Sequence, residues 1–274
     1  SADNGRFVAN AHTLIKIAQV IMLFPFTGWL VKMTYLIVPG EDQKVGYRES
    51  YQLKYIGDKV VFNPATAVVE VIKELERMAS LAEENLNRAM NALITLDEED
   101  IEEVYEVEKN INFLNHAITD YLVKINQTTL PIEDLNSLGA LFHVVNDIER
   151  IGDQASDIAE IVTYLSGACG HNTHIDQMAQ ATIKMVTDSL DAFVRRDLTL
   201  AWSVIEYDDV VDRLFDECKQ DLIAEIAQSP ADGERVLDVL MIAKYLERIG
   251  DHATNIAEWV EFSITGTHKS ETHV

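Results

Sequence analysis

Carboxylate side chains spaced four residues apart occur twice in this sequence. The first run contains Glu149, Asp153 and Asp157, and the second contains Glu247 and Asp251. On an α-helix, residues four apart lie on one face with Cβ atoms roughly 5–6 Å apart, and like charges at that spacing cost about 0.2–0.5 kcal/mol per pair. A cation bound along the face would offset this cost. The spacing therefore indicates either a metal site or a solvated acidic surface.

The two runs belong to a longer repeat. Residues 149–160 and 247–258 are identical at nine of twelve positions, with an offset of 98. An internal duplication explains this similarity, so we expect a fold built from two related units. Each copy also contains a glycine, Gly152 or Gly250. Because glycine in a helix interior costs about 0.8–1 kcal/mol relative to alanine, we expect a close helix contact, or space beside the carboxylates, at both positions.

Acidic and amide side chains recur four residues apart on a second predicted helix of each unit. Glu108 with Asn112 forms the first pair, and Asp208 with Asp212 forms the second, at an offset of 100. If neighbouring helices are antiparallel, each pair faces the acidic run of its own unit. Such clusters offer only oxygen ligands, which suit hard cations such as Fe³⁺, Mn²⁺, Mg²⁺ and Ca²⁺. The candidate metal ligands are Glu108, Glu149, Asp153, Asp208, Asp212, Glu247 and Asp251.

Six long helices must position these side chains. Asn63-Pro64, Asp97 and Ser229-Pro230 mark helix starts, because Asn, Asp and Ser cap helices and Pro suits the first turn. The loops are short, so neighbouring helices should be antiparallel. The sequence predicts an all-α fold of tandem three-helix bundles, preceded by one hydrophobic helix. The six expected helices cover residues 64–96, 98–126, 131–165, 175–196, 199–228 and 230–264.

The chain before residue 63 differs in character. Leu14–Val38 is its most apolar run and is long enough to span a bilayer of roughly 30 Å; a buried or interfacial helix is the alternative. The exposed apolar surface of such a segment would also favour a homodimer. The expected organisation is a hydrophobic, membrane-helix segment at 1–40, a connector at 41–62, repeats at 63–168 and 169–266, and a disordered tail at 267–274.

Charge and motifs exclude several classes of protein. The net charge is −24: residues 1–62 carry seven Lys/Arg and five Asp/Glu, or +2, and residues 63–274 carry fifteen and forty-one, or −26. This acidic part repels phosphate backbones, so nucleic acid is not an expected partner. The sequence contains no Glu-x-x-His motif of di-iron proteins, no phosphate loop and no HExxH motif. We therefore expect no catalytic residues and no enzyme.

The repeated ERIGD-x-A-x-x-I-A-E segments, together with the acidic pairs on the preceding helix, resemble the PhoU family. The resemblance implies tandem three-helix bundles that regulate phosphate uptake. It also implies that a Glu/Asp-x-x-x-Asp motif in each repeat holds metal ions, iron first, with manganese, zinc or magnesium as alternatives. The matching positions are Glu149 with Asp153 and Glu247 with Asp251.

The companion motifs differ between the two repeats. Asp208 with Asp212 matches the family motif, whereas Asn112 replaces the acid expected four residues after Glu108. Asn255 likewise replaces the acid found at Asp157. From these departures we expect the two clusters to bind metal unequally.

The N-terminal part carries a second resemblance. Residues 9–14 and 23–28 resemble the last membrane segment of bacterial sodium/phosphate cotransporters, in many of which a cytoplasmic PhoU-like domain follows. This resemblance implies a regulatory C-terminal part of such a transporter, cut from the full protein. It would lie in the inner (cell) membrane, with residues 63–274 cytoplasmic. Its partners would be the transporter membrane domain or other phosphate-transport components.

Two other readings of the acidic helices stay open at this stage. One is a purely structural or partner-binding acidic bundle that holds no metal, in which replacing an acid is neutral or slightly stabilising. The other is a metal-dependent enzyme that acts on a phosphate ester, which would need a metal pair and a general base. The sequence offers no separate candidate for that base.

Overall fold

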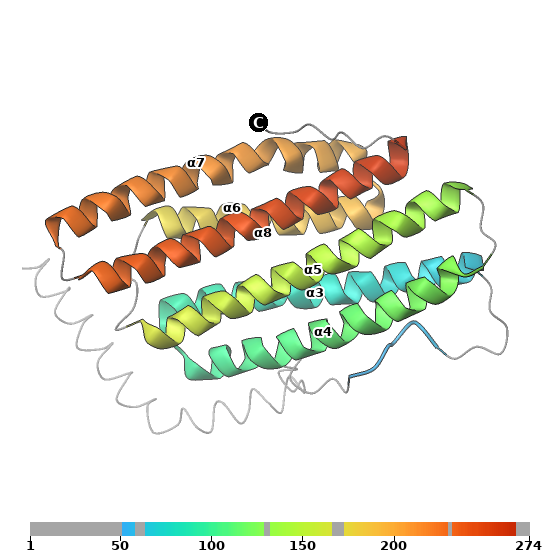
Figure 1. Ribbon diagram of the computed structural model, residues 1–274, viewed down its shortest axis with the longest axis horizontal. Helices are drawn as coiled ribbons and strands as arrows, with labels where there is room; N and C mark the ends of the chain where they lie inside the picture. The colour runs from blue at the N-terminus through green and yellow to red at the C-terminus, as the bar shows by residue number, and fades with distance from the viewer. Residues whose placement is uncertain (1–50, 58–63, 129–131, 166–172, 230–231, 267–274) are drawn as a thin grey trace, which may run out of the picture. The chain divides into compact units, whose positions relative to one another are not determined.

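The computed structural model describes residues 51–57, 64–128, 132–165, 173–229 and 232–266, and six α-helices account for most of them (Figure 1). No strand occurs among these residues. The predicted all-α fold is confirmed, while the hydrophobic helix expected before it lies outside the described residues. In chain order the helices are α3 (Pro64–Thr95), α4 (Glu98–Asn126), α5 (Ile132–Tyr164), α6 (Thr173–Arg195), α7 (Leu198–Gln228) and α8 (Gly233–Thr265).

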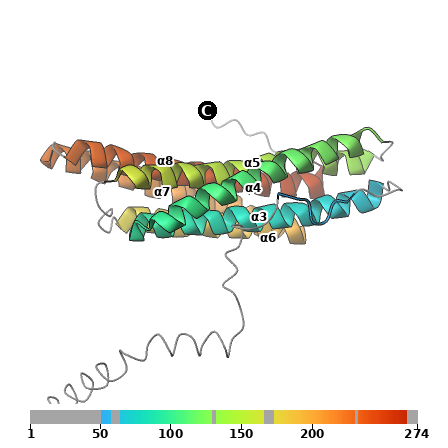
Figure 2. The same cartoon turned by 90° about the horizontal axis from the view of Figure 1, so that it is seen from below.

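The helices form two three-helix units. In one unit α3, α4 and α5 pack against one another, and in the other α6, α7 and α8 do the same. The units meet through two helix pairs, α5 with α8 and α3 with α6. Figure 2 shows these pairs as separate layers. Aliphatic side chains such as Leu75, Ile111 and Ile151 are fully buried in the core, so the periodic apolar faces drive the packing.

The duplication is visible in the turn that ends the first helix of each unit. Leu96 and Arg196 both adopt the left-handed conformation, with φ of 56° and 53°. The next residues, Asp97 and Asp197, cap the helices that follow. The Asp97 carboxylate accepts from the amide of residue 99 at 2.9 Å, and the Asp197 carboxylate accepts from that of residue 199 at 3.0 Å. The helix start predicted at Asp97 is thus confirmed.

The start of the last helix was predicted three residues too early. The sequence placed it at Ser229-Pro230, but α8 begins at Gly233 and Ser229 instead terminates α7. The amide of Ser229 donates to the carbonyl of Glu225 at 2.8 Å, and its own backbone is extended, with φ −134° and ψ 78°. A residue before proline is driven out of the helical region. Ser-Pro therefore ends a helix here, although the same pair is also typical of helix starts.

The two repeated glycines make unequal contacts. A Cβ atom added at Gly152 would lie 2.9 Å from Cδ1 and 3.3 Å from Cγ2 of Ile111 on α4. At Gly250 the nearest atom would be Cγ1 of Val211, at an ordinary 3.5 Å. Close helix approach therefore explains Gly152, whereas Gly250 has room for a methyl group.

This difference predicts opposite effects of one substitution. Gly250→Ala should raise the free energy of unfolding by up to about 1 kcal/mol, the helix-propensity gain. Gly152→Ala should have the same helix-propensity gain, but overpacking against Ile111 should lower the free energy of unfolding by about 1–3 kcal/mol. The net effect of Gly152→Ala should therefore be a loss of stability. Chemical denaturation of both variants measures the difference, and Ile111→Val combined with Gly152→Ala should recover part of the loss. Equal stabilisation by both alanines would contradict the contact geometry.

A buried carboxylate fastens the connector to α3. The Glu74 side chain is fully buried and accepts from the amides of Lys54 at 3.0 Å and Tyr55 at 2.8 Å. The guanidinium of Arg77 donates to Glu74 at 2.7 Å and to the carbonyl of Gln52 at 2.9 Å. The sequence predicted only an extended connector over residues 41–62. Of that range the structure describes residues 51–57, and it shows their attachment to the first helix of the bundle.

The sequence also predicted an inner (cell) membrane location. No helix within the described ranges is long and apolar enough to cross a bilayer. Each combines an apolar face with a charged one, as expected for helices that pack on a core and expose their other side. The stretch on which the prediction rested, Leu14–Val38, lies outside the described residues.

Candidate acidic metal-binding clusters

Helices α4 and α5 bring four carboxylates together, which we name cluster 1: Glu108, Glu149, Asp153 and Asp157. Burial raises the pKa of Glu108, the Asn112 amide opposes the rise, and the charges of Asp153 and Asp157 add to it. Burial likewise raises the pKa of Glu149, with a further contribution from Asp153. The two helices thus place like charges close together in a partly dehydrated setting, where a bound cation would be stabilised.

Helices α7 and α8 form the equivalent cluster 2: Asp208, Asp212, Glu247 and Asp251. Burial raises the pKa of Asp208 to about 6, the charges of Asp212 and Asp251 add to the rise, and a hydrogen bond from Thr254 opposes it. Burial and the charge of Glu247 raise the pKa of Asp212 and of Asp251. All seven candidate ligands from the sequence therefore lie in one cluster or the other, and Asp157 joins them.

Basic side chains of the same helices neutralise part of each cluster. In cluster 1, Nη1 of Arg150 lies 3.1 Å from Oδ2 of Asp153, and its Nε lies 3.6 Å from Oε2 of Glu149. In cluster 2, the ammonium of Lys244 forms an ion pair with Glu247. These cations oppose the rise in carboxyl pKa without removing it. Arg150 and Lys244 thus balance part of the negative charge of their clusters.

The donor chemistry suits a hard cation, although the side chains do not converge on one point. Among the described residues, no group of three or more His, Cys, Asp or Glu side chains is arranged to hold a metal ion. Several carboxylates bind protein groups instead: Glu108 accepts from Asn112, and Asp153 accepts from Arg150. Oε2 of Glu149 is buried and accepts no hydrogen bond from the described residues. Holding a metal would therefore require these side chains to turn toward one another.

A polar contact joins the two units across α5 and α8. Nδ1 of His252 lies 2.9 Å from Oδ1 of Asp147, and Nδ2 of Asn255 donates to the same oxygen at 3.3 Å. Nearby, the rings of His143 and Trp259 stack with centroids 3.9 Å apart. His252 directly follows Asp251 in the chain, so it lies on a different face of α8 from the acidic run. Asp147 was missed because Tyr245 occupies the equivalent position in the second copy, so no repeat drew attention to it.

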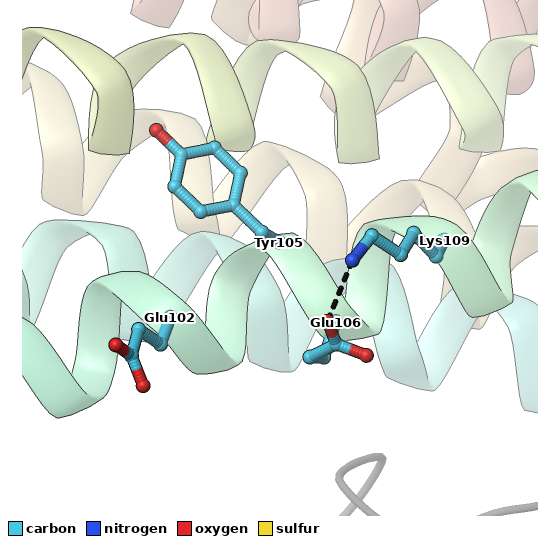
Figure 3. Close-up of a pocket in the computed structure, with 4 residues that line it drawn as sticks. All are labelled: Glu102, Tyr105, Glu106 and Lys109. Atoms are coloured by element: carbon cyan, nitrogen blue, oxygen red, sulfur yellow. Dashed lines mark hydrogen bonds and ion pairs between the residues drawn. The ribbon is translucent and has the colours of Figure 1, made fainter.

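A hollow of about 460 Å³ lies on α4, lined by Glu102, Tyr105, Glu106 and Lys109 (Figure 3). Figure 3 shows the Tyr105 ring pointing away from the two carboxylates, and Nζ of Lys109 lies 2.6 Å from Oε1 of Glu106. None of the seven candidate ligands lines this hollow. We therefore assign the candidate site to the two clusters.

The raised pKa of Asp208 predicts that the metal-free protein is more stable in mild acid. The folded-state pKa, about 6, exceeds the ordinary value of 3.8, so the folded protein takes up the proton more readily. The stability that protonation of Asp208 contributes is fully present below about pH 4 and is lost as the pH rises through about 6. Chelator-treated protein should gain melting temperature as the pH falls from 7.5 to 5.

The neutral variant Asp208→Asn tests the source of this dependence. It should raise the free energy of unfolding at pH 7.5 by about 1 kcal/mol, a figure reduced for the solvent that reaches the side chain. It should also weaken the pH dependence. Asp191→Asn, at a partly exposed position on α6 outside both clusters, is the matched control. A melting temperature that rises steadily from pH 5 to 7.5 would contradict the prediction.

The fold and the site define a protein of two tandem three-helix bundles with one acidic cluster in each. The PhoU domain family matches residues 67–162 and 175–260, and each range contains one cluster. A phosphate-specific transport system accessory protein PhoU homolog from Clostridium acetobutylicum is 34% identical over 201 residues, covering 72% of this chain and 92% of the relative. One from Pseudomonas aeruginosa is 37% identical over 205 residues, covering 72% and 84%. The chain belongs to the PhoU family.

Solved structures support the same assignment. The crystal structure of PhoU from Pseudomonas aeruginosa superposes with a TM-score of 0.73 at 34% identity, and the match covers 75% of this chain and all of that one. PhoU from Streptococcus pneumoniae, at 23% identity and a TM-score of 0.70, shows the fold alone. The names of the relatives that are more than 30% identical describe accessory proteins of phosphate-specific transport systems. Together with the helices described above, they overturn the predicted inner-membrane location.

Proposed function

We propose that this chain is a regulatory accessory protein of a phosphate transport system and not an enzyme. The observation that carries the proposal is family membership across both repeats, with relatives named as accessory proteins of phosphate-specific transport. Its expected partners are therefore components of such a transport system. The cotransporter context predicted from residues 9–28 rests on residues outside the described part and finds no support in these relatives, so the proposal does not include it.

The finer part of the proposal is that metal ions bind the two clusters, iron first, with manganese, zinc or magnesium as alternatives. The supporting observations are the partly buried carboxylates with raised pKa and the oxygen-only donor set. A bound cation would relieve the repulsion within each cluster and so change the charge of the surface offered to a partner. The ligands would be Glu108, Glu149 and Asp153 in cluster 1, and Asp208, Asp212, Glu247 and Asp251 in cluster 2.

A complementation experiment tests the regulatory function. The chain is expressed in a strain of Pseudomonas aeruginosa that lacks its own PhoU homologue, and phosphate uptake is measured at low and high external phosphate. Wild type should restore the dependence of uptake on phosphate supply. The double variant Asp153→Asn with Asp251→Asn should not, whereas Asp191→Asn should behave as wild type. Wild-type protein that accumulates in the cells without altering uptake would refute the proposal.

A further inference from the structure

One face of α4 carries a stripe of side chains that leads into the hollow shown in Figure 3. The hollow is lined by Glu102, Tyr105, Glu106 and Lys109. Phe113 follows Lys109 four residues later, so it lies one turn further along the same face. The stripe therefore combines two aromatic rings with two carboxylates and one ammonium group.

The second repeat does not share this stripe. At the offset of 100, the residues on α7 that correspond to the two aromatic rings and the lysine are Ile205, Asp209 and Arg213. The duplication kept the core positions of the two helices but changed this face. The stripe on α4 therefore has a role that belongs to the first repeat, which is the repeat that the connector joins.

The described part of the connector begins on this stripe. The rings of Tyr51 and Phe113 pack with centroids 5.9 Å apart and an interplanar angle of 55°. The hydrogen bond and the charge of Glu106 raise the pKa of Lys109, and Tyr51 adds a smaller contribution, so Tyr51 also lies near that ammonium group. Glu74 holds the amides of the connector residues that follow. The chain that precedes Tyr51 therefore starts beside the hollow.

Residues 45–50, which lie outside the described part of the chain, are long enough to follow the stripe. Extended backbone advances about 3.3–3.6 Å per residue, whereas a helix advances about 1.5 Å per residue. Arg48 precedes Tyr51 by three residues, or about 10 Å of extended chain. Glu106 precedes Phe113 by seven residues, which is also about 10 Å along α4. An extended segment that follows α4 thus brings Arg48 level with Glu106.

The chemistry of this segment complements that of the hollow. Tyr47 and Arg48 place an aromatic ring and a cation next to each other in the chain. Successive side chains of an extended segment point to opposite sides. Figure 3 shows the Tyr105 ring pointing away from the Glu106 carboxylate. A segment that runs between them would direct its cation toward the carboxylate and its ring toward the tyrosine.

We propose that residues 45–50 dock in the hollow on α4. In the docked segment Arg48 pairs with Glu106, which also accepts from Lys109. Tyr47 packs on the ring of Tyr105. The attachment of the connector, which the Glu74 carboxylate begins on α3, thus continues along α4 and covers the hollow. This docking is independent of metal binding and of the proposed transport function.

Site-specific photo-cross-linking of the full chain tests the docking. p-Benzoylphenylalanine replaces Tyr47 and so keeps an aromatic ring there. Dilute protein is irradiated, and the cross-linked peptides are identified by mass spectrometry. We expect cross-links within one chain to residues 102–109. Cross-links to other helices or to a second copy of the chain, without any to residues 102–109, would overturn the proposal, as would the absence of cross-links.

Charge reversal in the cross-linking protein tests the predicted ion pair. Arg48→Glu and Glu106→Lys should each lower the initial rate of cross-linking about 2- to 5-fold, the range for an exposed ion pair. The two changes together should restore the rate. Glu206→Lys, at the equivalent position of α7, is the matched control and should leave the rate unchanged. Equal rates in Glu106→Lys and Glu206→Lys would overturn the ion pair. The cross-link map needs neither substitution, so it stands even if a charge-reversed variant fails to fold.

Discussion

Glu74→Ala should lower the free energy of unfolding by about 3–5 kcal/mol, the usual cost of removing one partner from a buried ion pair. The carboxylate is fully buried and serves two connector amides as well as Arg77, whose side chain is only 11% exposed. Its loss leaves that guanidinium without its carboxylate in a dehydrated place. Chemical denaturation followed by circular dichroism measures the change.

Hydrogen exchange shows which part of the structure loses protection in Glu74→Ala. Hydrogen exchange of the Lys54 and Tyr55 amides should accelerate strongly in Glu74→Ala, because both amides donate to the missing carboxylate. Glu102→Ala, an exposed position on α4, is the matched control and should stay within about 0.5 kcal/mol of wild type. If Glu74→Ala lowers the free energy of unfolding by less than about 1 kcal/mol and the connector amides stay protected from exchange, the Glu74 carboxylate does not hold the connector in place.

Asn110→Leu should raise the free energy of unfolding by about 1–3 kcal/mol. Asn110 is 1% exposed, and neither its Nδ2 nor its Oδ1 has a hydrogen-bond partner among the described residues. An unsatisfied buried polar group costs about 1–3 kcal/mol, whereas an apolar side chain of similar shape avoids that cost. The second repeat already has Val210 at the equivalent position.

Thermal melting tests this second prediction. A gain of that size corresponds to a rise of roughly 2–4 °C per kcal/mol for a domain of this length. Asn146→Leu, at an exposed position on α5, should leave the melting temperature nearly unchanged. A loss of stability in Asn110→Leu would mean that the amide has a partner, such as an ordered water molecule, that leucine cannot replace.

Local sequence signals were sufficient to predict most of the fold. The Asp97 cap and the other helix-start signals predicted most of the helices and their order, because such signals depend on residues that are near one another in the chain. The error at Ser229-Pro230 arose from a pair that can either start or end a helix. The repeat then predicted which helices face each other, since two copies with short loops restrict the topology.

Local sequence signals do not predict contacts between residues that are far apart in the chain. Glu74 appeared to be one more acid of a helix, because its partners Lys54 and Tyr55 lie about twenty residues earlier. Asp147 was missed for a related reason, as its partner His252 lies 105 residues later. A repeat highlights positions that the two copies share, whereas these residues act where the copies differ. Nor did the spacing of the acids reveal that Lys244 forms an ion pair with Glu247.

The differences between the repeats also bear on the proposed function. Cluster 2 contains the carboxyl group with the most strongly raised pKa, Asp208, whereas cluster 1 has Asn112 in place of one acid and an arginine paired with two others. In cluster 1 the arginine already contacts two of the carboxylates, whereas in cluster 2 the lysine contacts one, so fewer ion pairs would have to break before a metal ion binds cluster 2. We expect cluster 2 to fill first as the metal concentration rises, so that the two repeats respond over different ranges.

Metal content is the most direct test of whether the two clusters are metal sites. Protein purified without chelators or immobilised metal is analysed by mass spectrometry, beside the quadruple variant Glu149→Gln, Asp153→Asn, Glu247→Gln and Asp251→Asn. We predict iron, or else manganese, zinc or magnesium, in at least stoichiometric amounts in the wild type and its loss in the variant. Metal-free wild type, with a variant of equal or greater stability, would contradict this account and leave an acidic surface that acts through protein contacts alone.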